Sequence, residues 1–186
     1  MQSTKKTSVK EESNSAIALL MEDHARVRAL FAEFKKIKDN ASAQTQKTEL
    51  VRQVCQELLV HAQVEEEIFY PAVRAAIDDE DLMDEAAVEH AGAKDLIRQL
   101  LEMTPGEELY DAKVTVLSES IEHHVGEEEG SMFPQARRAK GLEPSLGDQL
   151  QQRKLELLAQ LELPKAKKSV RTGAASKSQD APAAAR

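Results

Sequence analysis

The fold of this 186-residue chain is decided by a stretch that occurs twice, as HAQVEEEIFYP at residues 61–71 and as HVGEEEGSMFP at residues 124–134. The copies share a histidine, two glutamates, an aromatic residue and a proline in one register, and an arginine follows each proline after two further residues. Upstream, the pair DH at residues 23–24 corresponds to EH at residues 89–90. We therefore expect two copies of a helix pair, related by a pseudo-twofold axis, with a bend at each repeated proline.

The composition favours helices throughout. The chain has no Trp, seven Gly and six Pro, and no sustained alternation of β-branched residues, whereas good helix formers are plentiful. The first four helices, joined by short loops, predict an all-α, up-down-up-down four-helix bundle with an internal pseudo-twofold repeat. A fifth helix could cover one side of the bundle or form a dimer contact. Apolar periodicity places the five helices at residues 14–38, 47–77, 78–103, 107–140 and 145–163.

Charge is distributed unevenly along the chain. The last 22 residues hold six basic side chains and one acidic one, so the formal net charge of -8 leaves -13 for residues 1–164. A body that acidic repels phosphate backbones, and the basic tail is expected to be a flexible, solubilising end. The expected organisation is a disordered N-terminus (1–14), a four-helix bundle (15–140), an accessory C-terminal helix (145–163) and a disordered basic tail (164–186).

Several other classes of protein are excluded by what the sequence lacks. No run approaches the roughly 18 apolar residues of a membrane span, and the N-terminus lacks the apolar core of a signal peptide. The single cysteine, Cys55, cannot form an internal disulfide and is expected to be a small core residue. No glycine-rich phosphate loop, G-x-S-x-G or C-x-x-C motif is present. We expect a cytoplasmic monomer or dimer with no nucleic-acid or membrane partner.

Four of the five histidines lie on the apolar faces of the predicted helices, so their imidazoles should point into the bundle. Glu65 and Glu128 each follow an inward histidine by four residues and share its face. Burying two carboxylates without counter-charge costs on the order of several kcal/mol each. A pair of metal ions removes that cost, and mixed nitrogen and oxygen ligation suits iron best, with manganese or zinc as alternatives. The predicted ligands are His24, His61, Glu65, His90, His124 and Glu128.

Several other residues are candidates for roles near this site. His123 is the alternative to His124 as a ligand, although its polar neighbours place it on a flank of the helix. Tyr70 and Tyr110 are candidates for extra ligands. Three further glutamates are expected to hydrogen-bond to the ligands or to lie on the surface. They are Glu66, Glu127 and Glu129.

These residues resemble the hemerythrin-like, HHE cation-binding family of bacterial type over about residues 15–140. The marks of the resemblance are the isolated His24 and His90 and two H-x-x-x-E-E segments that lead into Tyr70-Pro71 and Phe133-Pro134. The resemblance implies a four-helix bundle with a non-haem di-iron centre, oxo- or hydroxo-bridged when oxidised. It also implies that the six predicted ligands occupy the ligand positions of the family.

One departure from the family pattern affects the expected function. Oxygen-carrying hemerythrins have H-x-x-x-H on the third helix, whereas here Lys94 stands four residues after His90, and Arg28 stands four residues after His24. Either side chain could donate hydrogen bonds to a bound peroxide or anion, or could form ion pairs with carboxylates on the surface. We expect a protein that binds, senses or reacts with O2, peroxide or nitric oxide, in oxidative or nitrosative stress or in iron handling. The alternatives are a regulatory or storage module without turnover and, less favoured, a metal-free phosphotransfer bundle.

Overall fold

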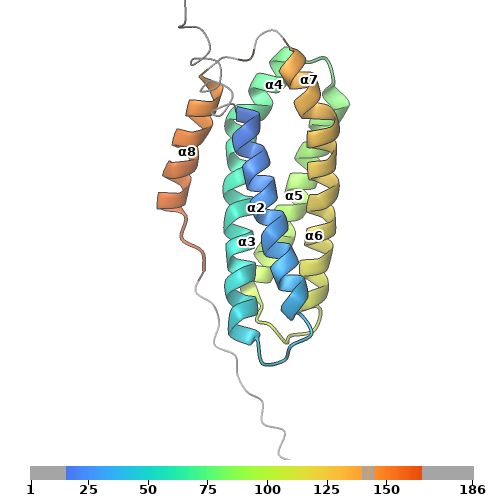
Figure 1. Ribbon diagram of the computed structural model, residues 1–186, viewed down its shortest axis with the longest axis vertical. Helices are drawn as coiled ribbons and strands as arrows, with labels where there is room; N and C mark the ends of the chain where they lie inside the picture. The colour runs from blue at the N-terminus through green and yellow to red at the C-terminus, as the bar shows by residue number, and fades with distance from the viewer. Residues whose placement is uncertain (1–15, 140–141, 143–144, 165–186) are drawn as a thin grey trace, which may run out of the picture.

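The computed structural model describes residues 16–139, 142 and 145–164, and within them it contains helices and no strand. The expected N-terminal segment 1–14 and the tail beyond residue 164 lie outside these residues, as does residue 140, where the fourth helix is expected to end. The described part confirms the predicted fold class: four long helical columns run up and down in sequence order (Figure 1).

Each of the two helix pairs occupies one half of the bundle. The first pair begins with α2 (Ala16–Ile37) and continues as α3 (Gln44–Val64), a π-helical segment η1 (Glu65–Phe69) and α4 (Tyr70–Ala76). The second pair begins with α5 (Glu80–Glu102) and continues as α6 (Tyr110–Glu127), a second π-helical segment η2 (Glu128–Met132) and α7 (Phe133–Arg138). The last helix is α8 (Leu146–Gln160).

The helix ends follow local capping chemistry. Asp79 caps α5 by accepting a hydrogen bond from the Leu82 backbone N–H at 3.4 Å. The fourth column begins at Tyr110 and not at residue 107, because the Glu107 carboxylate accepts hydrogen bonds from the backbone and hydroxyl groups of Thr104, at 2.9 and 2.7 Å, and closes a turn. Leu109, the residue before α6, has a left-handed φ of 68°.

The repeated prolines follow π-helical turns, which the sequence did not reveal. In each half the backbone N–H five residues on closes the turn: Tyr70 donates to the Glu65 carbonyl, and Phe133 to that of Glu128. In a regular α-helix, residues five apart point about 140° away from each other. The wider turn lets Glu65 and Tyr70 face inward together, and Pro71 then starts a new α-helical segment.

The hydrophobic core consists of two clusters, one toward each end of the bundle. The first joins α4, α7 and α8 to the neighbouring ends of α2, α3 and α5, and the second lies among α2, α3, α5 and α6 toward the opposite end (Figure 1). Cys55 lies in the second cluster with no exposed surface, as expected for a core residue. Among the described residues no helix is long and apolar enough to cross a membrane.

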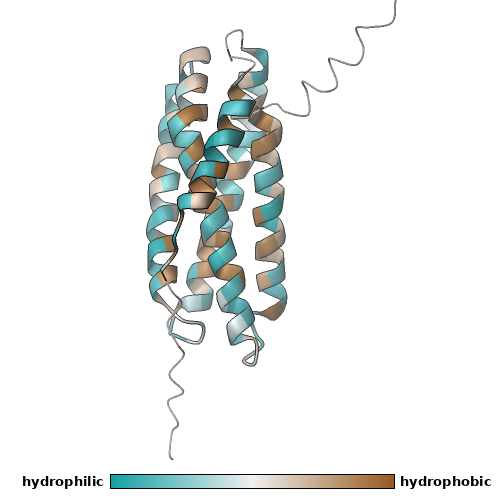
Figure 2. Cartoon of the chain, turned by 90° about the vertical axis from the view of Figure 1, so that its left-hand side faces the viewer, coloured by the Kyte–Doolittle hydropathy of each residue, from teal (hydrophilic) through white to brown (hydrophobic). Residues whose placement is uncertain are grey.

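The position of the fifth helix, which the sequence left open, is on the outside of α2 and α3 (Figure 1). Figure 2 shows this side of the molecule, where hydrophilic and hydrophobic residues alternate along each helix. Leu146, Leu150 and Leu157 of α8 are buried against a patch of the first core cluster that includes Val60 and Val64. The accessory helix therefore covers one face of the first helix pair.

Candidate metal centre

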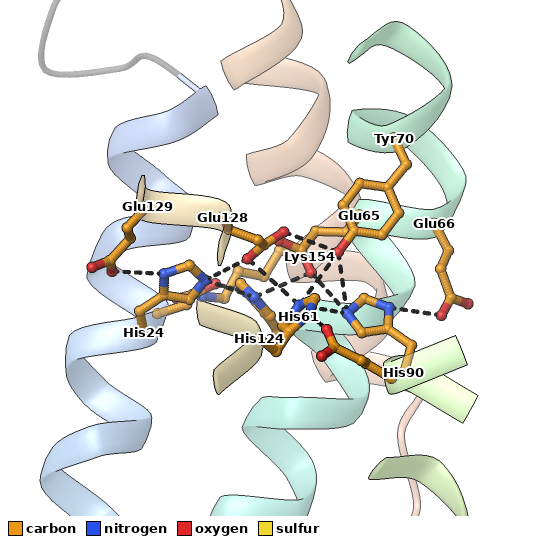
Figure 3. A network of polar contacts seen from close by, with 12 residues as sticks. His24, His61, Glu65, Glu66, Tyr70, His90, His124, Glu128, Glu129 and Lys154 are labelled. Atoms are coloured by element: carbon orange, nitrogen blue, oxygen red, sulfur yellow. Dashed lines mark hydrogen bonds and ion pairs between the residues drawn. The ribbon is translucent and has the colours of Figure 1, made fainter. Parts of the chain in front are cut away.

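Four buried imidazoles meet in the middle of the bundle, between the two core clusters (Figure 3). The Nε2 atoms of His24 and His61, from α2 and α3, lie 3.1 Å apart. The Nε2 atoms of His90 and His124, from α5 and α6, lie 3.1 Å apart as well. Each helix pair thus contributes one pair of histidines, as its repeat predicts.

Two buried carboxylates connect the histidine pairs. Glu65 Oε2 lies 3.2 Å from His61 Nε2 and 3.4 Å from His90 Nε2. Glu128 Oε2 lies 3.1 Å from His24 Nε2 and 3.6 Å from His124 Nε2. Each glutamate therefore stands between an imidazole of its own half and one of the other half.

The cluster divides into two groups of donor atoms that a metal ion could contact. The first is formed by His24, His61, Glu65 and Glu128, and the second by Glu65, His90 and His124. Both oxygens of Glu65 and one of Glu128 are buried without a hydrogen-bond partner among the described residues. Unpaired buried carboxylate oxygens are costly unless a cation neutralises them. The residues present therefore fit a pair of metal ions that share Glu65.

The pKa values in this cluster show how strongly its groups compete for protons. Burial raises the pKa of Glu65 to about 7, and the charge of Glu128 adds to the rise. Burial also opposes ionisation of Glu128, but the imidazole of His24, whose Nε2 lies 3.1 Å from Oε2, and those of His124 and His61 lower its pKa to about 2. The pKa of His61 rises to about 10 because Glu65 and Asp23 outweigh the effect of burial. Burial and His124 lower the pKa of His90 to about 4.

A carboxylate lies near the outward nitrogen of every histidine. Glu129 Oε1 lies 2.9 Å from His24 Nδ1, and Glu66 Oε1 lies 2.9 Å from His90 Nδ1. These contacts agree with the expected role of Glu66 and Glu129 beside the ligands. Such a carboxylate favours the tautomer that carries its proton on Nδ1, which leaves the inward Nε2 lone pair free for a metal.

The other two histidines have partners whose role the sequence did not suggest. Glu89 Oε2 lies 2.7 Å from His124 Nδ1, and Asp23 Oδ2 lies 3.5 Å from His61 Nδ1. The sequence pattern identifies Asp23 and Glu89 only as equivalent positions of the repeat. Their positions directly before His24 and His90 could have indicated this role, because a residue next to an inward-facing histidine faces the neighbouring helix.

Positively charged side chains bond three of these four carboxylates from the outer side. Arg28 Nη1 donates to Glu129 Oε1 at 3.0 Å, and Lys94 Nζ lies 2.5 Å from Glu66 Oε2. Lys154 of α8 bonds Asp23. The pKa of Asp23 is lowered although burial opposes it, because the imidazole of His61 and the ammonium of Lys154 both stabilise the charged carboxylate. Arg28 and Lys94 therefore pair with carboxylates, which is one of their two expected roles, but these carboxylates are the partly buried Glu129 and Glu66 beside the ligands.

Tyr70 makes the two halves of the cluster unequal. Its hydroxyl donates to Glu128 Oε1 at 2.9 Å and lies 3.3 Å from His90 Nε2. Burial raises its pKa well above the usual value, and the charges of Glu65 and Glu128 add to this. The equivalent residue, Phe133, has no hydroxyl and stacks on the His24 ring at 5.7 Å. A metal near His90 and His124 would have a phenol beside it that the other position lacks.

Two alternative ligands lie away from the cluster. His123 has a side chain that is 68% exposed, whereas His124 is buried and faces the other imidazoles. Tyr110 belongs to the second core cluster, and burial next to Cys55 raises its pKa. Glu127, expected near the ligands or on the surface, lies near His123, with its Oε1 3.6 Å from His123 Nε2.

A small cavity of about 20 Å³ borders the four histidines on the side away from Glu65 and Glu128. Its other walls are mostly aliphatic, including Val27, Leu58, Ala93, Ile97 and Ile121. A space of this size holds about one water-sized molecule. The cluster thus has room for a very small ligand in apolar surroundings.

This combination of fold and site defines a class: helical-bundle proteins that bind metal cations through histidines and carboxylates supplied by all four helices. Residues 15–136 match the family model described as the hemerythrin HHE cation binding domain, and the chain belongs to this family. The family assignment confirms the resemblance drawn from the two repeated segments.

Two relatives show how far the similarity extends. A hemerythrin HHE cation binding domain-containing protein from Mycobacterium kansasii, known from a crystal structure, has 26% sequence identity and a TM-score of 0.61. That match covers 75% of this chain and 85% of the other. A protein of a Nostoc species named DNA nickase is 30% identical over 115 residues, which are 62% of this chain and 31% of that protein. The chain thus matches less than a third of the length of that relative.

Proposed function

We propose that the buried cluster holds two iron ions and that this centre binds, senses or reacts with a small oxidant: O2, a peroxide or nitric oxide. The observation that carries the proposal is the placement of Glu65 and Glu128, both buried, with unpaired oxygens, each between imidazoles of opposite halves. Imidazole and carboxylate donors together suit iron, and manganese or zinc less specifically. The six proposed ligands are His24, His61, Glu65, His90, His124 and Glu128.

The protein groups around the centre have separate tasks. Bound iron would supply Lewis acidity and one-electron chemistry toward the small ligand. The four outer carboxylates orient the imidazoles, and the aliphatic cavity admits a very small ligand while excluding bulk water. Tyr70 holds a proton on a hydroxyl 2.9 Å from Glu128 and can donate it toward the cluster.

The second candidate is a regulatory or storage module that binds iron or O2 reversibly without turnover. It is favoured by the size of the cavity, which at about 20 Å³ leaves little space for a substrate and product together. Addition of peroxide to the iron-loaded protein separates the candidates. Multiple turnovers that disappear in His61→Ala support the enzyme, whereas a spectral change without turnover supports the module.

The first experiment measures metal content per chain in protein purified without oxygen, with absorption spectra before and after air is admitted. About two irons per chain and a new oxygen-dependent absorption band are expected. Protein that retains no iron after reconstitution with ferrous salt would contradict the proposal.

We propose no nucleic-acid or membrane partner, and we do not transfer the activity named for the Nostoc relative. The match covers 31% of that protein, and the acidic body of this chain disfavours contact with a phosphate backbone. A cytoplasmic location, with a role in stress response or iron handling, belongs to the same proposal.

A further inference from the structure

A second group of metal-binding side chains lies on the outer surface of α5 and α6. It occupies a recess of about 500 Å³, separate from the buried cluster. Among the described residues, the fixed positive charge paired with this recess is Arg74, which bonds Asp84 at 2.7 Å. A concentration of carboxylates with so little counter-charge attracts cations. The polar side chains of the recess are Asp81, Asp84, Glu85, Glu89, His123 and Glu127.

Three of these side chains are arranged as ligands. His123 Nε2 lies 3.5 Å from Glu89 Oε1 and 3.6 Å from Glu127 Oε1, and one donor atom from each residue lies within 4.8 Å of the others. Donors bound about 2.0–2.2 Å from one ion at tetrahedral angles are roughly 3.3–3.6 Å apart. The spacing is thus too long for good hydrogen bonds and close to that of shared metal ligands.

The other half of the bundle shows that the fold does not require these residue types. By the repeat, His123 corresponds to Val60, and Glu127 to Val64, both buried in the first core cluster near α8. No described helix covers the second face in the same way. Exposure alone explains polar residues there. It does not explain a histidine and a glutamate four residues apart that face a glutamate of the adjacent helix.

We propose that His123, Glu89 and Glu127 form an outer site for a divalent transition-metal cation such as Zn²⁺, with water completing its coordination. Glu89 connects this site to the buried centre, because its Oε2 lies 2.7 Å from His124 Nδ1 while its Oε1 faces His123. The outer site does not depend on which metal the buried centre holds.

The test counts bound zinc per chain by equilibrium dialysis of the full-length protein across a range of free Zn²⁺. His123→Ala should bind one zinc fewer than wild type and should fold normally, because its side chain is 68% exposed. If the buried cluster binds no zinc, the number of zinc ions per chain is lower in wild type and in His123→Ala alike. The difference of one zinc between the two proteins is still expected. Equal counts and equal affinities in the two proteins would overturn the outer site.

A matched pair of variants separates ligation from general attraction of cations. Glu127→Gln and Glu85→Gln remove the same charge from the same recess, but only Glu127 has a donor atom near His123. Glu127→Gln should weaken the outer zinc by about tenfold or more, and Glu85→Gln by much less. Similar losses in both variants would show that the recess only concentrates cations, and the proposal would fail.

Discussion

Lys94 Nζ lies 2.7 and 2.5 Å from the two carboxylate oxygens of Glu66, and Glu66 Oε1 lies 2.9 Å from His90 Nδ1. The lysine that stands where a further histidine would be expected in oxygen carriers therefore supports a ligand from outside. Arg28, Glu129 and His24 repeat this arrangement in the other half. The pKa of Glu66 is lowered although burial opposes it, because Lys94 and His90 both bond its carboxylate.

Removing the Glu66 charge should weaken metal binding without removing a ligand. In Glu66→Gln, the carboxylate that orients His90 is lost, and we expect metal affinity to fall roughly 10–100-fold. Glu67→Gln is the control, because Glu67 bonds Arg153 and Gln63 at the surface. Competition with a chromogenic chelator measures both. Equal affinities in the two variants would show that the contact between Glu66 and His90 does not influence the metal.

Glu65 and Glu128 should differ in what they do for the metal-free fold. Burial raises the pKa of Glu65, so Glu65→Gln should stabilise the metal-free protein while removing metal binding. Glu128 is held by His24 and Tyr70, so Glu128→Gln should destabilise it by about 1–3 kcal/mol. In a chain of this size each kcal/mol corresponds to about 2–4 °C in Tm. Thermal melts in chelator, which should shift in opposite directions, provide the measurement.

The fold and the convergence of the six predicted ligands could be inferred from sequence because each depends on the periodicity of a single helix. His61 and Glu65 share a face through their spacing alone, and the repeat transfers that reasoning to His124 and Glu128. The π-helical turns were not predictable in this way, because a proline in a helix signals a bend without giving its hydrogen-bond register.

Contacts between helices were the other part that sequence could not supply. The Nδ1 partners Asp23 and Glu89 depend on how α2 and α5 are rotated toward their neighbours. Lys154 reaches Asp23 from a helix whose docking face was undetermined. Periodicity within one helix carries no information on the neighbour that it meets.

Tyr70 should distinguish the two metal positions. Tyr70→Phe removes a hydroxyl that lies beside both His90 and His124 but touches only Glu128 of the other donor group, so we expect the affinity at the His90 and His124 position to fall by about tenfold and the affinity at the other position to fall by less. Tyr110→Phe is the control, because that phenol lies in the second core cluster. A stepwise metal titration resolves the two affinities. Equal losses at the two positions, or no loss at either, would contradict the asymmetry of the site.

The metal-free protein should lose stability as the pH rises above neutrality. The folded-state pKa of His61 is raised from 6.5 to about 10, so its contribution is complete below pH 6.5 and is lost up to about pH 10. The folded-state pKa of Glu65 is raised from 4.5 to about 7, so Glu65 also contributes less stability as the pH rises, over the range from about pH 4.5 to 7. Between pH 6.5 and 4.5, the lowered pKa of His90, about 4, removes stability as the solution becomes more acidic, and this loss offsets the gain from Glu65. Below pH 4.5, the lowered pKa values of His90 and Glu128 remove stability without that offset.

Tm measured in chelator should therefore be highest between about pH 4.5 and 6.5 and should fall toward pH 10. With metal bound, the loss toward alkaline pH should be smaller, because the cation replaces the proton at the cluster. The same decline with and without metal would show that groups outside the cluster cause it.

The accessory helix should influence the metal centre through one side chain. Lys154 of α8 bonds Asp23, whose carboxylate lies 3.5 Å from His61 Nδ1. Lys154→Met leaves Asp23 buried without its cation, so both stability and metal affinity should fall, the affinity by roughly tenfold. Arg153→Met is the matched control, because the adjacent Arg153 bonds Glu67 at the surface.

A truncation after Pro164 provides the complementary test, since it keeps α8 and removes the basic segment 165–186. Metal affinity should stay at the wild-type value in this variant. If the truncated protein loses metal and Lys154→Met does not, the influence on the centre comes from the basic segment and not from the contact between Lys154 and Asp23. If both variants bind metal as the wild type does, α8 serves only to cover Val60 and Val64.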